Sequence, residues 1–146
     1  MQTTIQMCED EQDNLLAQVP SEPYVMVIDD DPSILSVVSF LLDTEDYPNM
    51  SFSESMSVLP FLEKIHALGV RLPSLILLDL MMPMFSGYEI AAALAAYEQL
   101  SSIPILVMTA DHRVREASSV PGATDLINKP FHIEILLDKI EHFLTL

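Results

Sequence analysis

Short, uninterrupted apolar runs recur along the chain and alternate with segments whose apolar residues recur at helical spacing. Runs of this length are typical of strands buried on both faces of a parallel sheet. The predicted strands cover residues 24–28, 75–78, 103–108 and about 124–127, with a weaker one at 48–52.

The segments between these runs predict helices. Asp31 and Pro32 suit the N-cap and the first turn of a helix whose apolar residues continue to Leu42. Further helices are predicted over 58–68, 86–97 and 133–143, with a short polar helix between Asp111 and Ser119. The alternation predicts an α/β fold: a (βα)5 three-layer, doubly wound parallel sheet with the flavodoxin-like strand order 2-1-3-4-5.

The first 23 residues differ in composition from the rest of the chain. They contain five acidic residues and no basic one, and a Pro-Ser-Glu-Pro segment at 20–23 ends them. This pattern is typical of a mobile acidic tail. Since 146 residues suffice for one domain, we expect a tail at 1–23 and a single domain at 24–146.

Charge and hydropathy restrict the partners. Six Lys and Arg residues against 22 Asp and Glu residues give a net charge of −16, which repels nucleic-acid phosphates and anionic lipid headgroups. No uncharged apolar stretch reaches membrane-spanning length, and the start of the chain lacks the basic residues of a secretory signal. We therefore expect a cytoplasmic protein with no nucleic-acid or membrane partner. The single cysteine, Cys8, excludes an intramolecular disulfide framework.

Residues suited to phosphoryl chemistry follow four of the predicted strands. They are the aspartates at 29–31, then Asp79, Thr109 and Lys129. Taken singly, each has an ordinary explanation, such as an acidic helix start or a loop residue. However, the carboxyl ends of parallel strands lie along one edge of a sheet, so all of these side chains are expected to converge.

This combination of groups suggests a chemistry. Clustered carboxylates repel one another, and a hard divalent cation such as Mg²⁺ relieves the repulsion and can bind phosphate oxygens. A carboxylate can accept a phosphoryl group, while an ammonium and a hydroxyl stabilise its oxygens. The sequence therefore predicts magnesium-assisted phosphoryl transfer at this edge of the sheet.

Four segments carry a family resemblance: VMVIDDDPSI, LILLDLMMPMFSG, ILVMTA and GATDLINKPF. In this order and spacing they resemble the receiver domain of bacterial two-component response regulators, of the single-domain, chemotaxis-type kind, from about Tyr24 onward. The resemblance implies that Asp79 is the phosphoacceptor and that Asp30 binds Mg²⁺ directly. It also implies that Asp29 contacts the metal through water and that Met81 contributes its backbone carbonyl.

The resemblance assigns further roles near the other strand ends. Thr109 corresponds to the switch hydroxyl, Ala110 to the small neighbour that admits the phosphoryl group, and Lys129 to the phosphate-contacting ammonium, with a cis Lys129-Pro130 bond. The chain departs from the family pattern at Leu126, which stands at the aromatic switch position. The span from Thr109 to Lys129 is also slightly short, and Met-Phe-Ser at 84–86 replaces the usual Gly-Met-Asp.

The resemblance implies a stand-alone response regulator. Asp79 would take a phosphoryl group from a histidine kinase or phosphotransfer protein, with Mg²⁺, and a conformational change would signal to a downstream protein or relay. Such a domain catalyses only its own phosphorylation and dephosphorylation and is not otherwise an enzyme. A phosphorylation-dependent homodimer is consistent with this expectation.

Three alternatives are weighed against this interpretation. A phosphorylation-independent pseudo-receiver would serve as an interaction module, although such modules usually lose an acidic residue, the threonine or the lysine. A haloacid-dehalogenase-like phosphatase fits the Asp-x-Asp spacing of Asp29 and Asp31, but no second acidic pair follows Lys129. A flavodoxin-type FMN carrier would need hydroxyls and backbone amides after the first strand, where three aspartates stand.

Overall fold

Five short strands form a parallel sheet in the order β2-β1-β3-β4-β5 in the computed structural model, which describes residues 9–144. The strands are β1 (Val25–Ile28), β2 (Asn49–Phe52), β3 (Leu75–Asp79), β4 (Ile105–Thr109) and β5 (Asp125–Asn128). This topology confirms the expected fold class and strand order.

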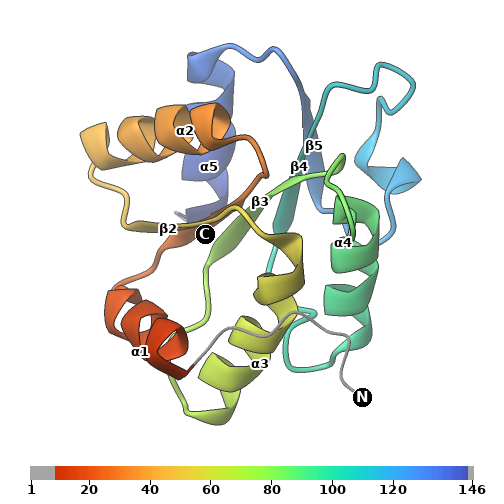
Figure 1. Ribbon diagram of the computed structural model, residues 1–146. Helices are drawn as coiled ribbons and strands as arrows, with labels where there is room; N and C mark the ends of the chain where they lie inside the picture. The colour runs from red at the N-terminus through yellow and green to blue at the C-terminus, as the bar shows by residue number, and fades with distance from the viewer. Residues whose placement is uncertain (1–8, 145–146) are drawn as a thin grey trace.

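Helices cover both faces of the sheet (Figure 1). On one face lie α2 (Pro32–Thr44) and α5 (Ile133–Leu144), and on the other lie α3 (Val58–Ala67) and α4 (Gly87–Ala96). A short 3-10 helix, η1 (Ser55–Ser57), leads into α3. None of the helices within residues 9–144 combines the length and hydrophobicity needed to cross a membrane.

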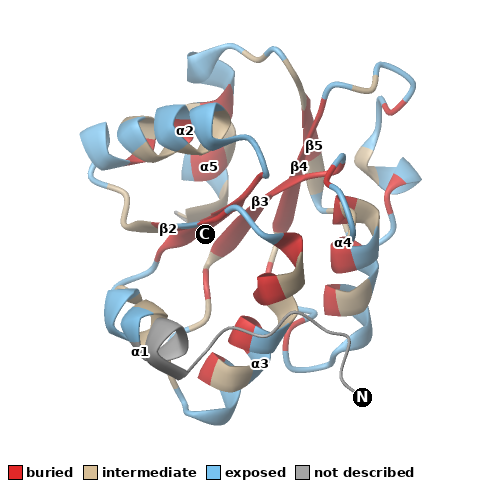
Figure 2. Ribbon diagram, viewed as in Figure 1, coloured by how far each residue is buried: buried red, intermediate tan, exposed pale blue. Residues whose placement is uncertain are grey.

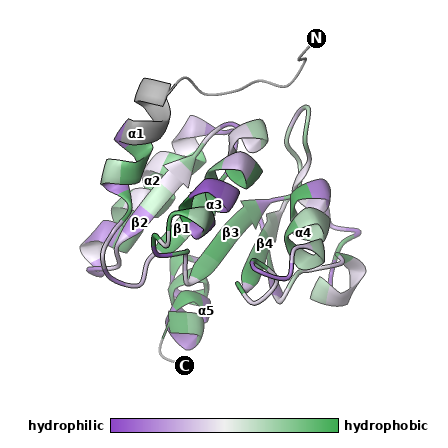
Figure 3. Cartoon of the chain, turned by 90° about the horizontal axis from the view of Figure 1, so that it is seen from below, coloured by the Kyte–Doolittle hydropathy of each residue, from purple (hydrophilic) through white to green (hydrophobic). Residues whose placement is uncertain are grey.

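The core has two layers, one on each side of the sheet. Along β1, Val25 and Val27 point to the layer under α2 and α5, whereas Met26 and Ile28 point to the layer under α3 and α4. This alternation follows from the period of two in a strand, and all four residues are fully buried. Figure 2 shows the buried strands between helices whose outer faces are exposed, and Figure 3 shows the inner strands β1, β3 and β4 as strongly hydrophobic.

Helix ends form where the sequence predicts them. The Asp31 side chain accepts a hydrogen bond from the Ser33 backbone N–H at 2.9 Å, with Pro32 in the first turn of α2. Ser86 and Glu89 form a capping box at the start of α4, which satisfies two backbone donors that would otherwise lack partners. Gly69 follows the C-cap of α3 with φ 71°, a conformation that glycine adopts without steric cost.

The prediction of a short helix between Asp111 and Ser119 is wrong. This connection between β4 and β5 contains turns and one 3-10 helix, η2 (Ala117–Ser119). The Asp111 carboxylate accepts the backbone N–H of Arg113, and Val114 and Val120 are both buried in the layer of α3 and α4. A segment this short gains little from helix formation, so its local side-chain bonds and apolar contacts determine its conformation.

Part of the expected tail is helical. Helix α1 (Glu9–Gln18) precedes the sheet, and Leu15, Leu16 and Val19 pack against the core layer of α3 and α4. The Arg71 side chain also donates to the Ser21 carbonyl oxygen at 3.0 Å. The domain boundary at residue 24 stays a prediction, and these contacts attach the preceding segment to the domain. Residues 1–8, including Cys8, lie outside the described residues.

Candidate functional site

Strand register brings the first carboxylates together. Ile28 of β1 lies opposite Leu78 of the parallel neighbour β3, so the next residues, Asp29 and Asp79, lie side by side at the edge of the sheet. Asp30 follows in the loop, and carboxylate oxygens of the three aspartates lie within 4.8 Å of one another. Asp29 and Asp79 are buried whereas Asp30 is exposed, so the cluster opens to solvent on the Asp30 side.

Lys129 joins the cluster from the end of β5. Its ammonium Nζ lies 2.7 Å from Asp29 Oδ2 and 3.4 Å from Asp79 Oδ1. Its backbone N–H donates to the Thr109 carbonyl at 2.7 Å, and the Lys129-Pro130 bond is cis, as the resemblance implied. The side chain therefore reaches back across two strands to the carboxylates.

The electrostatics of the cluster are unequal. The pKa of Asp79 is raised to about 6: burial is the largest cause, the Asp29 charge adds to it, and Lys129 and the Met81 backbone N–H oppose both effects. Burial alone would lower the pKa of Lys129, but its hydrogen bond to Asp29 and the charge of Asp79 outweigh this effect and raise it. The ammonium is thus held charged beside a carboxyl group whose ionisation costs free energy.

Asp29 and Asp79 differ in how their oxygens are used. Asp29 accepts from Lys129 at Oδ2 and from the Asp31 backbone N–H at Oδ1, at 2.9 Å. Both oxygens of this fully buried side chain are therefore engaged, which disfavours Asp29 as the nucleophile of the haloacid-dehalogenase alternative. Asp79 accepts the Met81 backbone N–H at 3.3 Å, also at Oδ1.

Thr109 ends β4 next to the cluster. Asp79 pairs with Met108 in the parallel register, so Thr109 lies one residue further toward the same edge. Its buried hydroxyl accepts the Asp111 backbone N–H at 3.0 Å, which ties it to the loop between β4 and β5. Ala110 is exposed, and Leu126 is buried on β5 opposite Val107 of β4.

Gly87 contributes to the site, although the sequence pattern indicates only that it follows the Ser86 cap. A Cβ at this position would overlap the backbone carbonyl of Asp79, and the Gly87 N–H donates to the Leu80 carbonyl at 3.1 Å. The start of α4 thus packs directly on the backbone of Asp79. A glycine next to the Ser86 cap is the only sequence feature that indicates this close approach. That the approach is to the backbone of Asp79 is known only from the fold.

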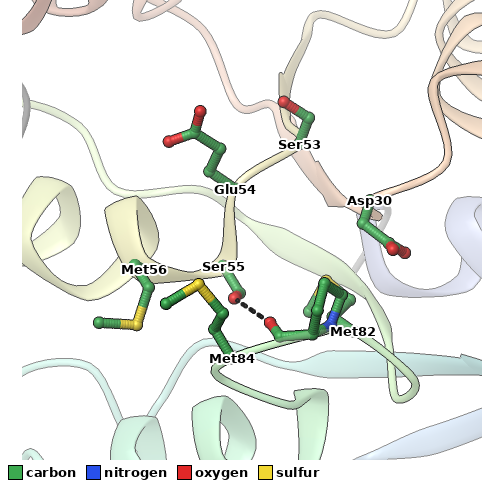
Figure 4. Close-up of a pocket in the computed structure, with 8 residues that line it drawn as sticks. Asp30, Ser53, Glu54, Ser55, Met56, Met82 and Met84 are labelled. Carbon is green, nitrogen blue, oxygen red and sulfur yellow. Dashed lines mark hydrogen bonds between the residues drawn. The ribbon is translucent and has the colours of Figure 1, made fainter. Parts of the chain in front are cut away.

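A cavity of about 310 Å³ opens beside the aspartates (Figure 4). Asp30 lines one side, the loop after β2 another, and the loop after β3 a third. Ser55 bridges the two loops because its hydroxyl donates to the Pro83 carbonyl at 3.3 Å. This cavity depends on contact between loops that are distant in sequence, so no local sequence pattern predicts it.

The donor set suits a hard cation. Carboxylate oxygens are the ligands that Mg²⁺ prefers, and the three aspartates present them within one small volume. The exposed position of Asp30 leaves room for the water ligands that Mg²⁺ retains. Coordination by the Met81 carbonyl stays a prediction, and the Met81 side chain is 60% exposed.

Comparison with known proteins agrees with this geometry. The family described as "Response regulator receiver domain" matches residues 25–141. Among curated relatives, the DNA-binding dual master transcriptional regulator RpaA of Synechocystis sp. is 33% identical over 125 residues, which cover 84% of this chain and 49% of RpaA. Hybrid signal transduction histidine kinase D of Dictyostelium discoideum is 32% identical over 130 residues, 88% of this chain but 8% of that protein.

Solved structures give the same relationship. A response regulator receiver protein from Burkholderia phymatum has a TM-score of 0.70 at 27% identity, covering 86% of this chain and 97% of that one. The chemotaxis response regulator CheY4 of Vibrio cholerae has a TM-score of 0.68 at 28% identity, covering 84% and 99%. The chain thus matches nearly whole receiver structures but spans about half of RpaA.

Proposed function

The chain belongs to the response regulator receiver domain family, and on that premise we propose that Asp79 accepts a phosphoryl group from a histidine kinase or a histidine phosphotransfer protein. The observation that carries the proposal is the position of Lys129, whose ammonium contacts both Asp29 and Asp79 at the open edge of the sheet. A carboxylate nucleophile flanked by a fixed cation is suited to an incoming phosphoryl group, which carries negative charge.

In the proposed reaction, a carboxylate oxygen of Asp79 attacks phosphorus as the bond from phosphorus to the donor imidazole nitrogen breaks. The product is an acyl phosphate on Asp79, and the donor histidine, whose other ring nitrogen carries a proton, leaves as a neutral imidazole. Hydrolysis by water returns the carboxylate and inorganic phosphate. In this proposal the chain catalyses only its own phosphorylation by the donor and its own dephosphorylation by water.

The neighbouring side chains have distinct parts in this proposal. Lys129 moves from Asp79 to the phosphoryl oxygens and neutralises their charge, while it keeps its bond to Asp29. The Thr109 hydroxyl donates to another phosphoryl oxygen, and it already contacts the loop after β4 through the Asp111 N–H. The exposed Ala110 offers a small side chain at the entrance.

Asp29, Asp30 and Asp79 would hold Mg²⁺, with the Met81 carbonyl as a further ligand. When bound, Mg²⁺ would supply charge neutralisation for the phosphoryl oxygens and for the clustered carboxylates. Asp30, as the exposed member, presents its carboxylate from the solvent side. Asp29 orients Lys129 and keeps it charged.

We propose that the signal leaves the domain through protein contacts. Thr109 connects the acceptor to the β4–β5 connection, so phosphorylation would change the surface there and alter binding to a downstream protein, a relay histidine or a second copy. A phosphorylation-independent module is the second candidate, favoured by Leu126 in place of the aromatic switch residue. The relative RpaA is described as DNA-binding, but the net charge of −16 disfavours nucleic acid as a partner of the present chain.

Acetyl phosphate with Mg²⁺ tests the acceptor assignment. We expect a labile acyl phosphate, located on Asp79 by mass spectrometry after borohydride trapping, and no adduct in Asp79→Asn. Asp138→Asn is the matched control because Asp138 is an exposed carboxylate on α5. An adduct that persists in Asp79→Asn and maps to Asp29 or Asp31 would contradict the proposal and favour phosphatase-like chemistry.

A further inference from the structure

We propose that the groove between α3 and α4 is a docking site for a basic amphipathic helix of a partner protein. Three cavities of about 310, 210 and 220 Å³ lie in a row there. The first and second share Met56, and the second and third share Glu63. They therefore form one continuous surface feature, the α3–α4 groove, which begins beside Asp30 and ends at Leu100.

The length of the groove fits a short helix. One wall consists of Met56, Leu59, Pro60, Glu63 and His66. This spacing of i, i+3, i+4, i+7 and i+10 places the side chains on one stripe of η1 and α3. From Met56 to His66 the stripe is about 15 Å long, the length of a helix of about ten residues.

The opposite wall is mostly apolar, with Gln99 as a polar member, and its side chains are adaptable. Met82, Met84 and Phe85 come from the loop after β3, and Tyr97 and Leu100 follow α4. Figure 4 shows the Met84 side chain extending toward Met56, whereas Met82 lies nearer Asp30. Methionine side chains bend easily and pack against apolar groups of varied shape, so such a wall suits a protein partner.

Met84 carries a second sign of a binding role. It is 76% exposed and has a φ of 68°, in the left-handed region that non-glycine residues rarely adopt. An exposed apolar side chain on a strained backbone contributes little to folding stability. Strain of this kind concentrates at ligand and switch sites, which favours a contact made by Met84 outside the domain.

Charge identifies the partner. Asp30, Glu54 and Glu63 line the groove, and among residues 9–144 no lining residue of the three cavities is Lys or Arg. An apolar strip bordered by carboxylates complements a helix with one apolar face and flanking Lys or Arg residues. A second copy of this chain, with its own net charge of −16, is a poor match. This inference does not depend on phosphorylation of Asp79.

The test uses a labelled synthetic peptide of about twelve residues with Leu at helical spacing and Lys elsewhere. Fluorescence anisotropy measures its binding to the full chain. Leu59→Gln and Met84→Gln each remove an apolar contact without changing charge, and Glu63→Gln removes one carboxylate. The matched controls are Phe40→Gln, which alters an apolar residue 60% exposed on α2, and Asp138→Asn on α5.

We expect each groove variant to weaken peptide binding by roughly tenfold. The two controls should change it by less than about twofold. Because Met84 is so exposed, its variant should fold normally even if Leu59→Gln does not. Circular dichroism and labelling of Asp79 by acetyl phosphate check each variant, so a failed docking site is distinguished from a failed phosphoacceptor.

Four results would overturn the proposal. Equal weakening in Phe40→Gln and Asp138→Asn, or equal binding of a scrambled peptide of the same composition, would show general attraction to an acidic surface. Equal binding of a peptide with Glu in place of Lys would remove the charge argument. A dimer in sedimentation velocity that Met84→Gln dissociates, without peptide binding, would assign the groove to a second copy.

Discussion

The Lys129 ammonium lies 2.7 Å from Asp29 Oδ2, and these two residues are 100 positions apart in sequence. Asp29 directly follows β1 and Lys129 directly follows β5, so the pair links two strands that β3 and β4 separate in the sheet. The Asp29 side chain is 1% exposed and that of Lys129 is 17% exposed. An ion pair with one partner so deeply buried depends strongly on both members being present.

Replacement of Lys129 by Met should therefore destabilise the protein at neutral pH. We expect the free energy of unfolding in EDTA to fall by about 3 kcal/mol at pH 7, because Asp29 would remain buried without its cation. The loss should shrink below the raised pKa of Asp79, where Asp79 is protonated and no longer repels Asp29. Urea denaturation measures both effects.

Lys139→Met is the control for that experiment. Lys139 pairs with Asp125 at 2.8 Å, but the two side chains are 29% and 38% exposed. Its loss should cost less than about 1 kcal/mol, as for other solvent-exposed pairs. Equal destabilisation by Lys129→Met and Lys139→Met would show that burial of Asp29 does not make its ion pair with Lys129 more important for stability than an exposed pair.

Asp79→Asn should stabilise the protein in EDTA at pH 7. The folded-state pKa of Asp79 is raised to about 6, mainly by burial and then by the Asp29 charge. A raised pKa means that the favourable contribution is present below about pH 4 and is lost as pH rises through about 6. We expect Asn to add on the order of 1–3 kcal/mol at pH 7 and little at pH 4. A gain that does not depend on pH would contradict this explanation.

Asp30→Asn should weaken Mg²⁺ binding while the fold stays intact. Asp30 is the exposed member of the carboxylate cluster, so its charge is not needed for packing. We expect at least a roughly tenfold loss of affinity, the lower end of losses for outer-sphere metal partners. Calorimetric titration with MgCl₂ measures it. Asp31→Asn is the matched control, since Asn also caps helices well; unchanged affinity in Asp30→Asn would refute the metal assignment.

Removal of residues 1–20 should lower stability without abolishing phosphorylation. A chain that begins at Ser21 keeps the Arg71 contact but loses the packing of Leu15, Leu16 and Val19. We expect a cost of about 2 kcal/mol from the lost apolar contact and a near-normal rate with acetyl phosphate. A Leu15→Ser/Leu16→Ser double variant should reproduce the cost, whereas the exposed Ala17→Ser should not. Unchanged stability in the truncated chain and in the Leu15→Ser/Leu16→Ser variant would show that α1 contributes little to folding stability.

Phosphorylation should perturb the loop after Thr109. The Thr109 hydroxyl contacts the Asp111 N–H, so a new bond to a phosphoryl oxygen should shift this loop even though Leu126 has no ring to move. Backbone NMR with and without beryllofluoride, at saturating Mg²⁺, maps the change. The coupling should be modest, about 1–3 kcal/mol, and larger in Leu126→Tyr. Residues 111–128 that do not shift would leave Asp79 without a conformational output.

Structural features that depend only on neighbouring residues are predicted most accurately from the sequence. Apolar runs give the strands, and Asp31 and Ser86 give the helix starts because capping depends on a single side chain. The convergence of Asp29, Asp79 and Lys129 also follows, since it needs only parallel strands that end at a common edge.

Other features depend on contacts that no local pattern contains. The segment 111–119 contains residues that can enter a helix, but burial of Val114 and Val120 and the Asp111 turn determine its conformation. Helix α1 is not predicted because acidic residues dominate the composition of its segment. Leu15 and Leu16 pack on the core through tertiary contacts, which the local sequence does not indicate. The α3–α4 groove could be predicted only if the hydrogen bond between Ser55 and the Pro83 carbonyl were known.

The absence of an α-helix in residues 111–119 has a consequence for the speed of any response. A packed helix shifts collectively, and such motions take microseconds to milliseconds, whereas loops rearrange in nanoseconds to microseconds. The β4–β5 connection has turns and one short 3-10 helix in place of such a body. A disturbance at Thr109 would therefore spread through many small, rapid local adjustments, and the new arrangement would be reached soon after the chemical event that causes it.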